Sequence, residues 1–87
     1  MVKFQGAVVK EQGVKFAIVI VKSHIVQMQS EARDAIQNFG RFFPGIPVVL
    51  MAQDSSGTPT YYGRKDIAKF LSTVPINAIS WKECTFS

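Results

Sequence analysis

The sequence predicts an α/β (α+β) fold, a single small domain whose mixed sheet has about five strands and carries two helices. Three observations predict it. Residues 17–21 and 45–52 have no polar side chains, which is typical of strands covered on both faces of a sheet. Two other segments repeat apolar residues at helical spacing. Polar clusters between these pieces set the order strand, strand, helix, strand, strand, helix, strand.

The first two strands are predicted over residues 2–10 and 14–22, joined as a hairpin. Both are rich in Val, Ile and Phe, and the polar residues between them include Gly13, which suits a tight reversal. In the first strand, Phe4 and Val8 share one face and the other face is partly polar, so we expect this strand to be half exposed. The second strand has no polar face in its middle and is predicted near the sheet centre.

The first helix is predicted to begin at the N-cap Ser30 and to end at Pro44 and Gly45. Glu31 and Asp34 lie in its first turn, where the helix dipole favours acidic side chains. The apolar residues at helical spacing are Ala32, Ala35, Ile36, Phe39 and Phe43.

The segment before this helix, residues 23–29, is predicted to be a loop or a helical turn. Ile25 and Met28 continue the helical stripe backwards, and Ser23 could itself be an N-cap, so a longer helix is the alternative. We expect the crossover from the second strand through the helix to the third strand to be right-handed, with the two strands parallel. The sheet is therefore predicted to be mixed.

The third strand lies within residues 45–52 and is followed by a cluster of turn-forming residues over 53–57. A returning strand is predicted over 58–62. Because Pro59 has no amide to donate to a ladder, we expect this strand to lie at an edge or to begin after the proline.

The second helix is predicted over residues 64–72, because Ile67, Ala68, Phe70 and Leu71 give an apolar stripe that ends before Pro75. A last strand is predicted over 76–86. Its Ile79 and Trp81 are expected on one face, with Ala78, Cys84 and Phe86 broadly on the other.

Residues 45–71 carry an ordered set of short motifs: Gly-Ile-Pro, a buried strand, a polar turn, a second strand with a following glycine, and a helix ending in Lys-Phe-Leu. This order resembles the closing portion of thioredoxin-like folds. The resemblance implies a partly thioredoxin-like C-terminal half, with Pro47 in the loop where that family usually has a cis proline. The redox chemistry of the family needs a Cys-x-x-Cys pair, and this chain contains only Cys84. The resemblance therefore concerns architecture and not activity.

Composition predicts one domain over residues 1–87 that associates with itself. The chain is 47% hydrophobic and only 18% charged, which is more apolar surface than a small sphere can easily hide. A net charge of +4 favours anionic partners by long-range attraction. The lone Cys84 and the lack of a secretory type of leader predict the cytoplasm. The apolar stretches, residues 16–21 and 45–52 among them, are far below the roughly 20 residues of a membrane span, which predicts a soluble protein.

The first candidate functional surface is the start of the second helix. A helix start presents free backbone amides, and two cations there oppose a dipole that favours acids, so a bound anion would relieve the conflict. The predicted anion or ligand site consists of Tyr62, Gly63, Arg64 and Lys65. The alternative is that Arg64 and Lys65 are solvated and Asp66 helps to cap the turn. Tyr61 and Tyr62 point to opposite faces, so we expect one in the core and the other available for stacking.

The second candidate surface is the first hairpin, where lysines alternate with aromatic residues. These are Lys3, Lys10, Lys15 and Lys22, with Phe4 and Phe16. Such a pattern can follow phosphates and stack bases. The alternative is an edge strand guarded by lysines against further pairing. No Lys/Arg-Gly-Phe signature of RNA-binding domains accompanies the lysines, which favours the guarding role.

A catalytic set is harder to find. His24 after the second strand could act as a base, and Asp54, with two serines behind it, follows the third strand, where open sheets often place ligands. However, a turn would contain Asp54 anyway, and a lone histidine is more often structural. Cys84 is expected to be a buried inert thiol, and Trp81 a core or interface anchor.

We therefore expect a small non-enzymatic binding or interaction protein that self-associates as a homodimer or binds another protein. The sequence predicts no catalytic residues, metal site, cofactor or membrane contact. One alternative is the binding of an anion, a phosphorylated ligand or single-stranded nucleic acid at the helix start described above. The other alternative is a weak hydrolase that uses His24 and Asp54.

Overall fold

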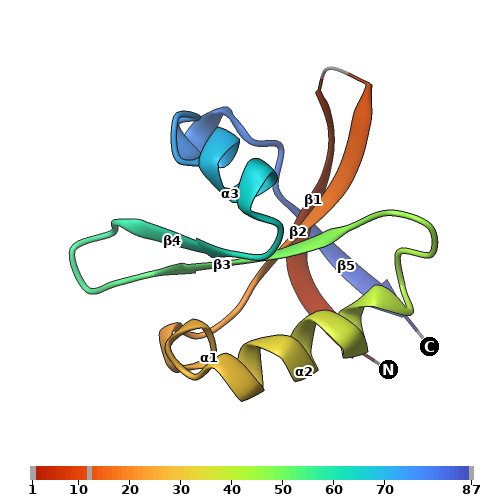
Figure 1. Cartoon of the computed structure of the whole chain (residues 1–87), viewed down its shortest axis with the longest axis horizontal. Coiled ribbons are helices and arrows are strands. Elements are labelled where there is room, and N and C mark those ends of the chain that lie inside the picture. Colours follow the sequence, from red (N-terminus) through yellow and green to blue (C-terminus); the bar gives the residue numbers. More distant parts are fainter. Residues whose placement is uncertain (1, 12, 87) are drawn as a thin grey trace.

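The structure is a computed structural model that describes residues 2–11 and 13–86 (Figure 1). Its five strands form one sheet in the order β4-β3-β2-β1-β5. The strands are β1 (Val2–Glu11), β2 (Val14–Ile20), β3 (Val48–Gln53), β4 (Pro59–Tyr62) and β5 (Lys82–Phe86). The helical elements are α1 (Ser23–Gln27), α2 (Gln29–Gly40), α3 (Lys65–Leu71) and the 3-10 turn η1 (Ile76–Ala78). The predicted mixed sheet with two main helices is confirmed.

The parallel pair β2 and β3 lies in the middle of the sheet, where Ile18 is opposite Val49 and Val19 is opposite Leu50. The other three pairs of neighbouring strands are antiparallel. Residues 16–19 and 48–52 are buried, as the absence of a polar face predicted. The two hairpins, β1 with β2 and β3 with β4, lie on either side of this parallel contact.

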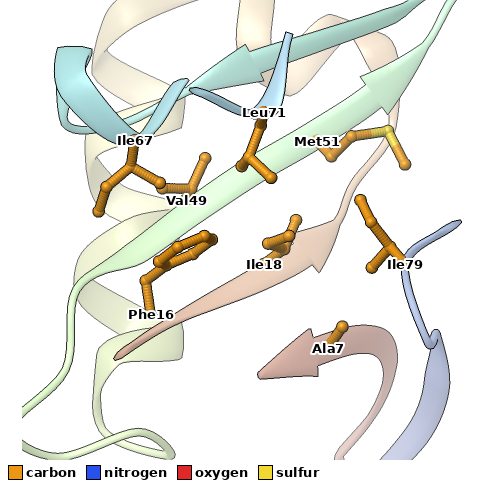
Figure 2. Close-up of a cluster of buried hydrophobic side chains, with 8 residues drawn as sticks. All are labelled: Ala7, Phe16, Ile18, Val49, Met51, Ile67, Leu71 and Ile79. Atoms are coloured by element: carbon orange, nitrogen blue, oxygen red, sulfur yellow. The ribbon is translucent and has the colours of Figure 1, made fainter. Parts of the chain in front are cut away.

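Helices cover both faces of the sheet: α3 lies on one side, and α1 and α2 lie on the other (Figure 1). Side chains of a strand alternate between the two faces, so each strand contributes to two cores. The α3-side cluster consists of Ala7, Phe16, Ile18, Val49, Met51, Ile67, Leu71 and Ile79 (Figure 2). The α2-side cluster consists of Phe4, Ala17, Val19, Ala32, Val48 and Leu50. Together they form a single globule with a Cα radius of gyration of 12.1 Å.

The α2-side cluster is extended by a group of phenylalanine rings. Phe4 of β1 lies at its centre, with ring centroids 4.9 Å from Phe39 and 5.7 Å from Phe86. Phe42 stacks on Phe86 at 4.5 Å, and Phe43 meets Phe4 edge-on at 6.0 Å. These contacts join α2, the chain after it and the two strands β1 and β5.

The first helix differs from its prediction at both ends. Its N-cap is Met28 and not Ser30, because the extended backbone at Met28 separates α1 from α2 and the Met28 carbonyl accepts the Ala32 amide at 2.9 Å. The helix ends at Gly40, before the predicted stop at Pro44. Phe42 N–H donates to the Phe39 carbonyl at 3.0 Å, and this tight turn carries Phe42 to the aromatic group.

The segment 23–29 is helical over its first five residues, in line with the predicted helical turn. Ser23 is not the cap, since Lys22 occupies that position and no side chain caps the helix. Met28, placed on the helical stripe by the sequence, is more than half exposed at the break between the helices.

The last strand is shorter than predicted, because residues 76–81 cover the α3-side cluster before the chain joins the sheet at Lys82. Trp81 Nε1 donates to the Ile76 carbonyl at 3.0 Å and holds this segment in a turn. The predicted shared side of Ile79 and Trp81 is confirmed, since both pack on the α3-side cluster. Ala78 lies in η1 and not in a strand.

Residues 45–71, the segment whose motif order resembles thioredoxin-like folds, form β3, β4 and α3 in the expected order. β4 begins at Pro59 and lies at the edge of the sheet, as the missing proline amide predicted. α3 spans Lys65–Leu71 with Arg64 and Ser72 as caps, which matches the predicted helix over 64–72. The bond before Pro47 is trans, as are all peptide bonds among the described residues, unlike the usual proline of that family.

Candidate functional site

The predicted site at Tyr62, Gly63, Arg64 and Lys65 forms the connection between β4 and α3. Gly63 is there for close packing: a Cβ atom on it would lie 3.0 Å from Val49 Cγ2 and 3.3 Å from the Val48 carbonyl oxygen. The glycine lets the chain pass tightly over β3 before the helix begins. Its role in the structure is therefore to hold the strand and the helix together.

The guanidinium group of Arg64 is already paired within the helix start. Arg64 Nη2 donates to Asp66 Oδ2 at 2.7 Å, and Nε donates to Oδ1 at 3.1 Å. This hydrogen-bonded pair raises the pKa of Arg64 and lowers the pKa of Asp66. Asp66 thus neutralises much of the charge that an anion would use, while Lys65 is exposed. Anion binding here stays a prediction.

The two tyrosines of β4 point to opposite faces, as predicted, but neither is fully available for stacking. Tyr61 packs against the α3-side cluster and Tyr62 against the α2-side cluster, and both are half-buried. The expectation of one exposed ring is corrected, because each face of the sheet at β4 is covered by helices. Burial raises the pKa of the Tyr61 phenol.

The four lysines of the first hairpin separate into two pairs at its two ends. Lys10 and Lys15 lie directly opposite each other near the hairpin turn. Lys3 and Lys22 lie near the other end, where the same register, continued outward, places them opposite each other. The interpretation of the whole hairpin as a guarded edge is corrected, because β2 lies between β1 and β3, and β1 is covered by β5 over residues 2–6. Only residues 7–11 of β1 are paired with a described strand on one side alone.

A groove of about 600 Å³ opens at the carboxyl end of β2, between β1, α1 and α2. Three basic side chains line it: Lys3, Lys22 and His24. The apolar lining consists of Phe4, Ile20, Val21, Ile25, Ala35 and Phe39. The sequence assigned Lys3 and Lys22 to the hairpin surface and His24 to a catalytic role. The hairpin register could have joined the two lysines, but the helix residues come from a packing that no local pattern encodes.

Asp54, the other candidate catalytic residue, is engaged in its own turn. Its Oδ1 accepts the amides of Ser56 and Thr58, both at 2.9 Å, and the Ser56 hydroxyl at 2.7 Å. These bonds, with the hydroxyl contribution the largest, lower the pKa of Asp54. His24 is exposed, and no hydrogen bond among the described residues joins it to Asp54. The arrangement fits the turn role, and the hydrolase stays a prediction.

The remaining reactive side chains give no further site. Cys84 is half-buried in β5 and packs against the α2-side cluster. Within residues 2–11 and 13–86, no three side chains of His, Cys, Asp or Glu gather as metal ligands. In the same residues, no helix has the length and the apolar character needed to cross a membrane.

Comparisons with known proteins give no relative: no protein-family model, curated protein or solved structure matches this chain.

Proposed function

We propose that this chain is a non-enzymatic interaction domain that pairs with a second copy of itself along the outer side of β1. The observation that supports this most strongly is the length of β1. Its ladder with β5 ends at the pair Gly6–Lys82, whereas its ladder with β2 continues to Glu11. Residues 7–11 are therefore paired on one side only among the described strands. In an antiparallel ladder alternate residues turn their amides and carbonyls outward, so this segment offers hydrogen-bonding groups to another strand.

The exposed side chains of this segment suit a copy of the same segment. Val8 is 51% exposed and is the most exposed of the valines. An antiparallel pair of two β1 segments centred on Val9 places Val8 opposite Lys10 of the copy. It also places Ala7 opposite Glu11. No like charges are then directly opposite each other, and the two-fold arrangement is closed.

The shape of the sheet edge also favours a copy. β5 covers β1 only as far as Gly6, so the edge of the sheet steps inward from β5 to residues 7–11 of β1. A hollow of about 200 Å³ lies beside this step. Gly6, Val8 and Lys82 are among the residues that line the hollow. A strand of a second copy would lie beside residues 7–11 of β1 and continue the sheet.

The half-buried free thiol of Cys84 fits a reducing compartment, so the proposed location is the cytoplasm.

The test is the molar mass in solution, measured by size-exclusion chromatography with light scattering at high micromolar concentration. The unmodified chain is expected to run as a dimer. Val8→Lys is expected to run as a monomer, because it sets a lysine opposite Lys10 of the copy. Val8→Glu is expected to stay dimeric, since it makes the opposite-charge pair at the same place.

Val2→Lys is the matched control, because Val2 is a 41% exposed valine of the same strand within the segment that β5 already covers. It is expected to leave the dimer intact. Circular dichroism of each variant checks that the fold is retained. A monomeric unmodified chain, or equal loss of the dimer in Val2→Lys and Val8→Lys, would contradict the proposal.

A further inference from the structure

We propose that the groove at the carboxyl end of β2 binds a small amphipathic anion, that is, a carboxylate or phosphate attached to an apolar body. The groove is independent of the β1 segment used for pairing. It is lined by residues at the start of β1, by residues 20–25, and by one side of α2. The groove has a volume of about 600 Å³ and is broadly open to solvent, so a bound ligand would keep part of its surface exposed.

The charge of the groove selects for an anion. Lys3 reaches it from β1, Lys22 from the connection between β2 and α1, and His24 from the first turn of α1. None of the nine lining residues is acidic, so no carboxylate of the lining competes for the two ammonium groups. This differs from the start of α3, where Asp66 already occupies Arg64. A negative group in the groove would meet cations from two separate parts of the chain.

The apolar lining selects for the rest of the ligand. Phe4 and Phe39 form an edge-to-face pair with centroids 4.9 Å apart, and Ile25 and Ala35 add aliphatic surface from the two helices. Phe39, Ile25 and Ala35 are half-buried, so part of each side chain contacts solvent. A ligand with an alkyl chain or a planar ring would cover this surface, and a fully hydrated inorganic ion would not.

The position of the groove agrees with a general property of sheets. Ligands of open α/β sheets bind outside the carboxyl ends of strands, beside the point where neighbouring connections diverge. β2 has the antiparallel β1 on one side and the parallel β3 on the other. The chain leaves β2 at this end and turns into α1, and the groove lies beside this turn, next to the start of β1.

The test uses four probes that share one alkyl body: octanoate, octyl phosphate, octanol and octylammonium. Binding is followed by titration in ¹H–¹⁵N correlation spectra, which also locate the site. We expect octanoate and octyl phosphate to shift the amides of residues 3–4 and 20–25, and to bind more tightly than octanol. Octylammonium is expected not to bind. The stronger of the two anions tells whether the natural ligand carries a carboxylate or a phosphate.

Two double variants provide the decisive comparison. Lys3→Gln with Lys22→Gln removes two charges from the groove and is expected to weaken octanoate and octyl phosphate binding roughly fivefold. Lys15→Gln with Lys69→Gln removes two charges from exposed positions that lie outside both the groove and the pairing segment of β1, and is expected to leave the affinity unchanged. The net charge of the two proteins is identical, so long-range attraction cancels in the comparison.

Three results would overturn the proposal. The first is the absence of shifts at the groove with either anion. The second is equal binding of octanol and octanoate, which would leave an apolar surface without anion selection. The third is an equal loss of affinity in the two double variants, which would mean that only net charge matters. Each variant is first checked by circular dichroism, and the Lys15/Lys69 variant shows whether the loss of two lysines is tolerated.

Discussion

Tyr61 carries a buried hydroxyl group that has no hydrogen-bond partner among the described residues. A buried hydroxyl without a partner loses its hydration and gains nothing in return. We expect Tyr61→Phe to raise the free energy of unfolding by about 1 kcal/mol, because the ring stays and only the unpaired group is removed. Urea unfolding curves measure this.

Tyr62→Phe is the matched control, since Tyr62 is the half-buried neighbour on the other face and its hydroxyl is not among the buried unpartnered atoms. It should change the free energy of unfolding little.

The pH dependence of stability is a second test of the buried Tyr61 hydroxyl. Burial raises the pKa of Tyr61, so the folded state keeps a proton that the unfolded chain loses. Stability should fall as the pH rises through about 10, and less so in Tyr61→Phe. A destabilised Tyr61→Phe would contradict this account.

The start of α3 shows which part of a site can be predicted from residue types. The sequence correctly places the end of β4, the glycine and the helix start at residues 62–65. It does not decide which partner the Arg64 guanidinium takes. Asp66 was expected to help cap the turn, and it instead bonds to Arg64 two residues earlier. That choice depends on side-chain rotamers, which a spacing pattern does not determine.

Gly6 lies at the point of β1 where the ladder with β5 ends and the outer segment begins. A Cβ atom on Gly6 would lie 2.6 Å from the Ile18 carbonyl oxygen, which belongs to the backbone of the central strand and cannot move aside cheaply. We expect Gly6→Ala to lower the free energy of unfolding by about 1–3 kcal/mol, the range of an overpacked core. Thermal and urea unfolding measure it.

Gly40→Ala serves as the control for Gly6→Ala. Gly40 is the last residue of α2, and a Cβ atom there would have no atom within 4 Å. It should be neutral or stabilise the protein by up to about 1 kcal/mol, because alanine has the higher helix propensity. Equal effects of the two substitutions would show that the close contact at Gly6 is not the cause.

The strands were easier to predict than the ends of the helices, for a physical reason. A central strand needs apolar side chains on both faces, and residues 17–21 and 45–52 show that directly. The end of α2 at Gly40 and the late start of β5 at Lys82 depend on partners far along the chain. Phe42 leaves the helix to stack on Phe86, and Ile79 packs in the α3-side cluster with Ala7 and Phe16. Such long-range contacts have no signature at the residues where the elements end.

The two cores share one sheet, so we expect them to unfold together. Phe86 supports the α2-side cluster, where it stacks on Phe42 and Phe4. Trp81 packs on the α3-side cluster across the sheet and reports on it by fluorescence. We expect Phe86→Ala to lower the free energy of unfolding by about 2–3 kcal/mol, since the half-buried ring is lost from a stacked group. The Trp81 transition should move with the circular dichroism transition by the same amount.

Separate transitions from the two probes in Phe86→Ala would mean that each face of the sheet unfolds independently.

The groove beside β2 and the unpaired outer side of β1 are properties of the whole fold. Lys3, His24 and Phe39 line one groove only because α1 and α2 pack on β3 and Phe39 of α2 reaches Phe4 of β1. The free side of β1 follows from the late start of β5. Neither feature has a local pattern, so neither could be predicted from the sequence.

Val2 and Phe86 are opposite each other across β1 and β5, near the two ends of the chain marked in Figure 1. Neighbouring strands are about 5 Å apart, so polypeptide attached at both ends would enter and leave at nearly one place. Such a domain can be spliced into a surface loop of a host protein with little distortion of that loop. The host would then carry the groove and the open strand as an appendage on a short double tether.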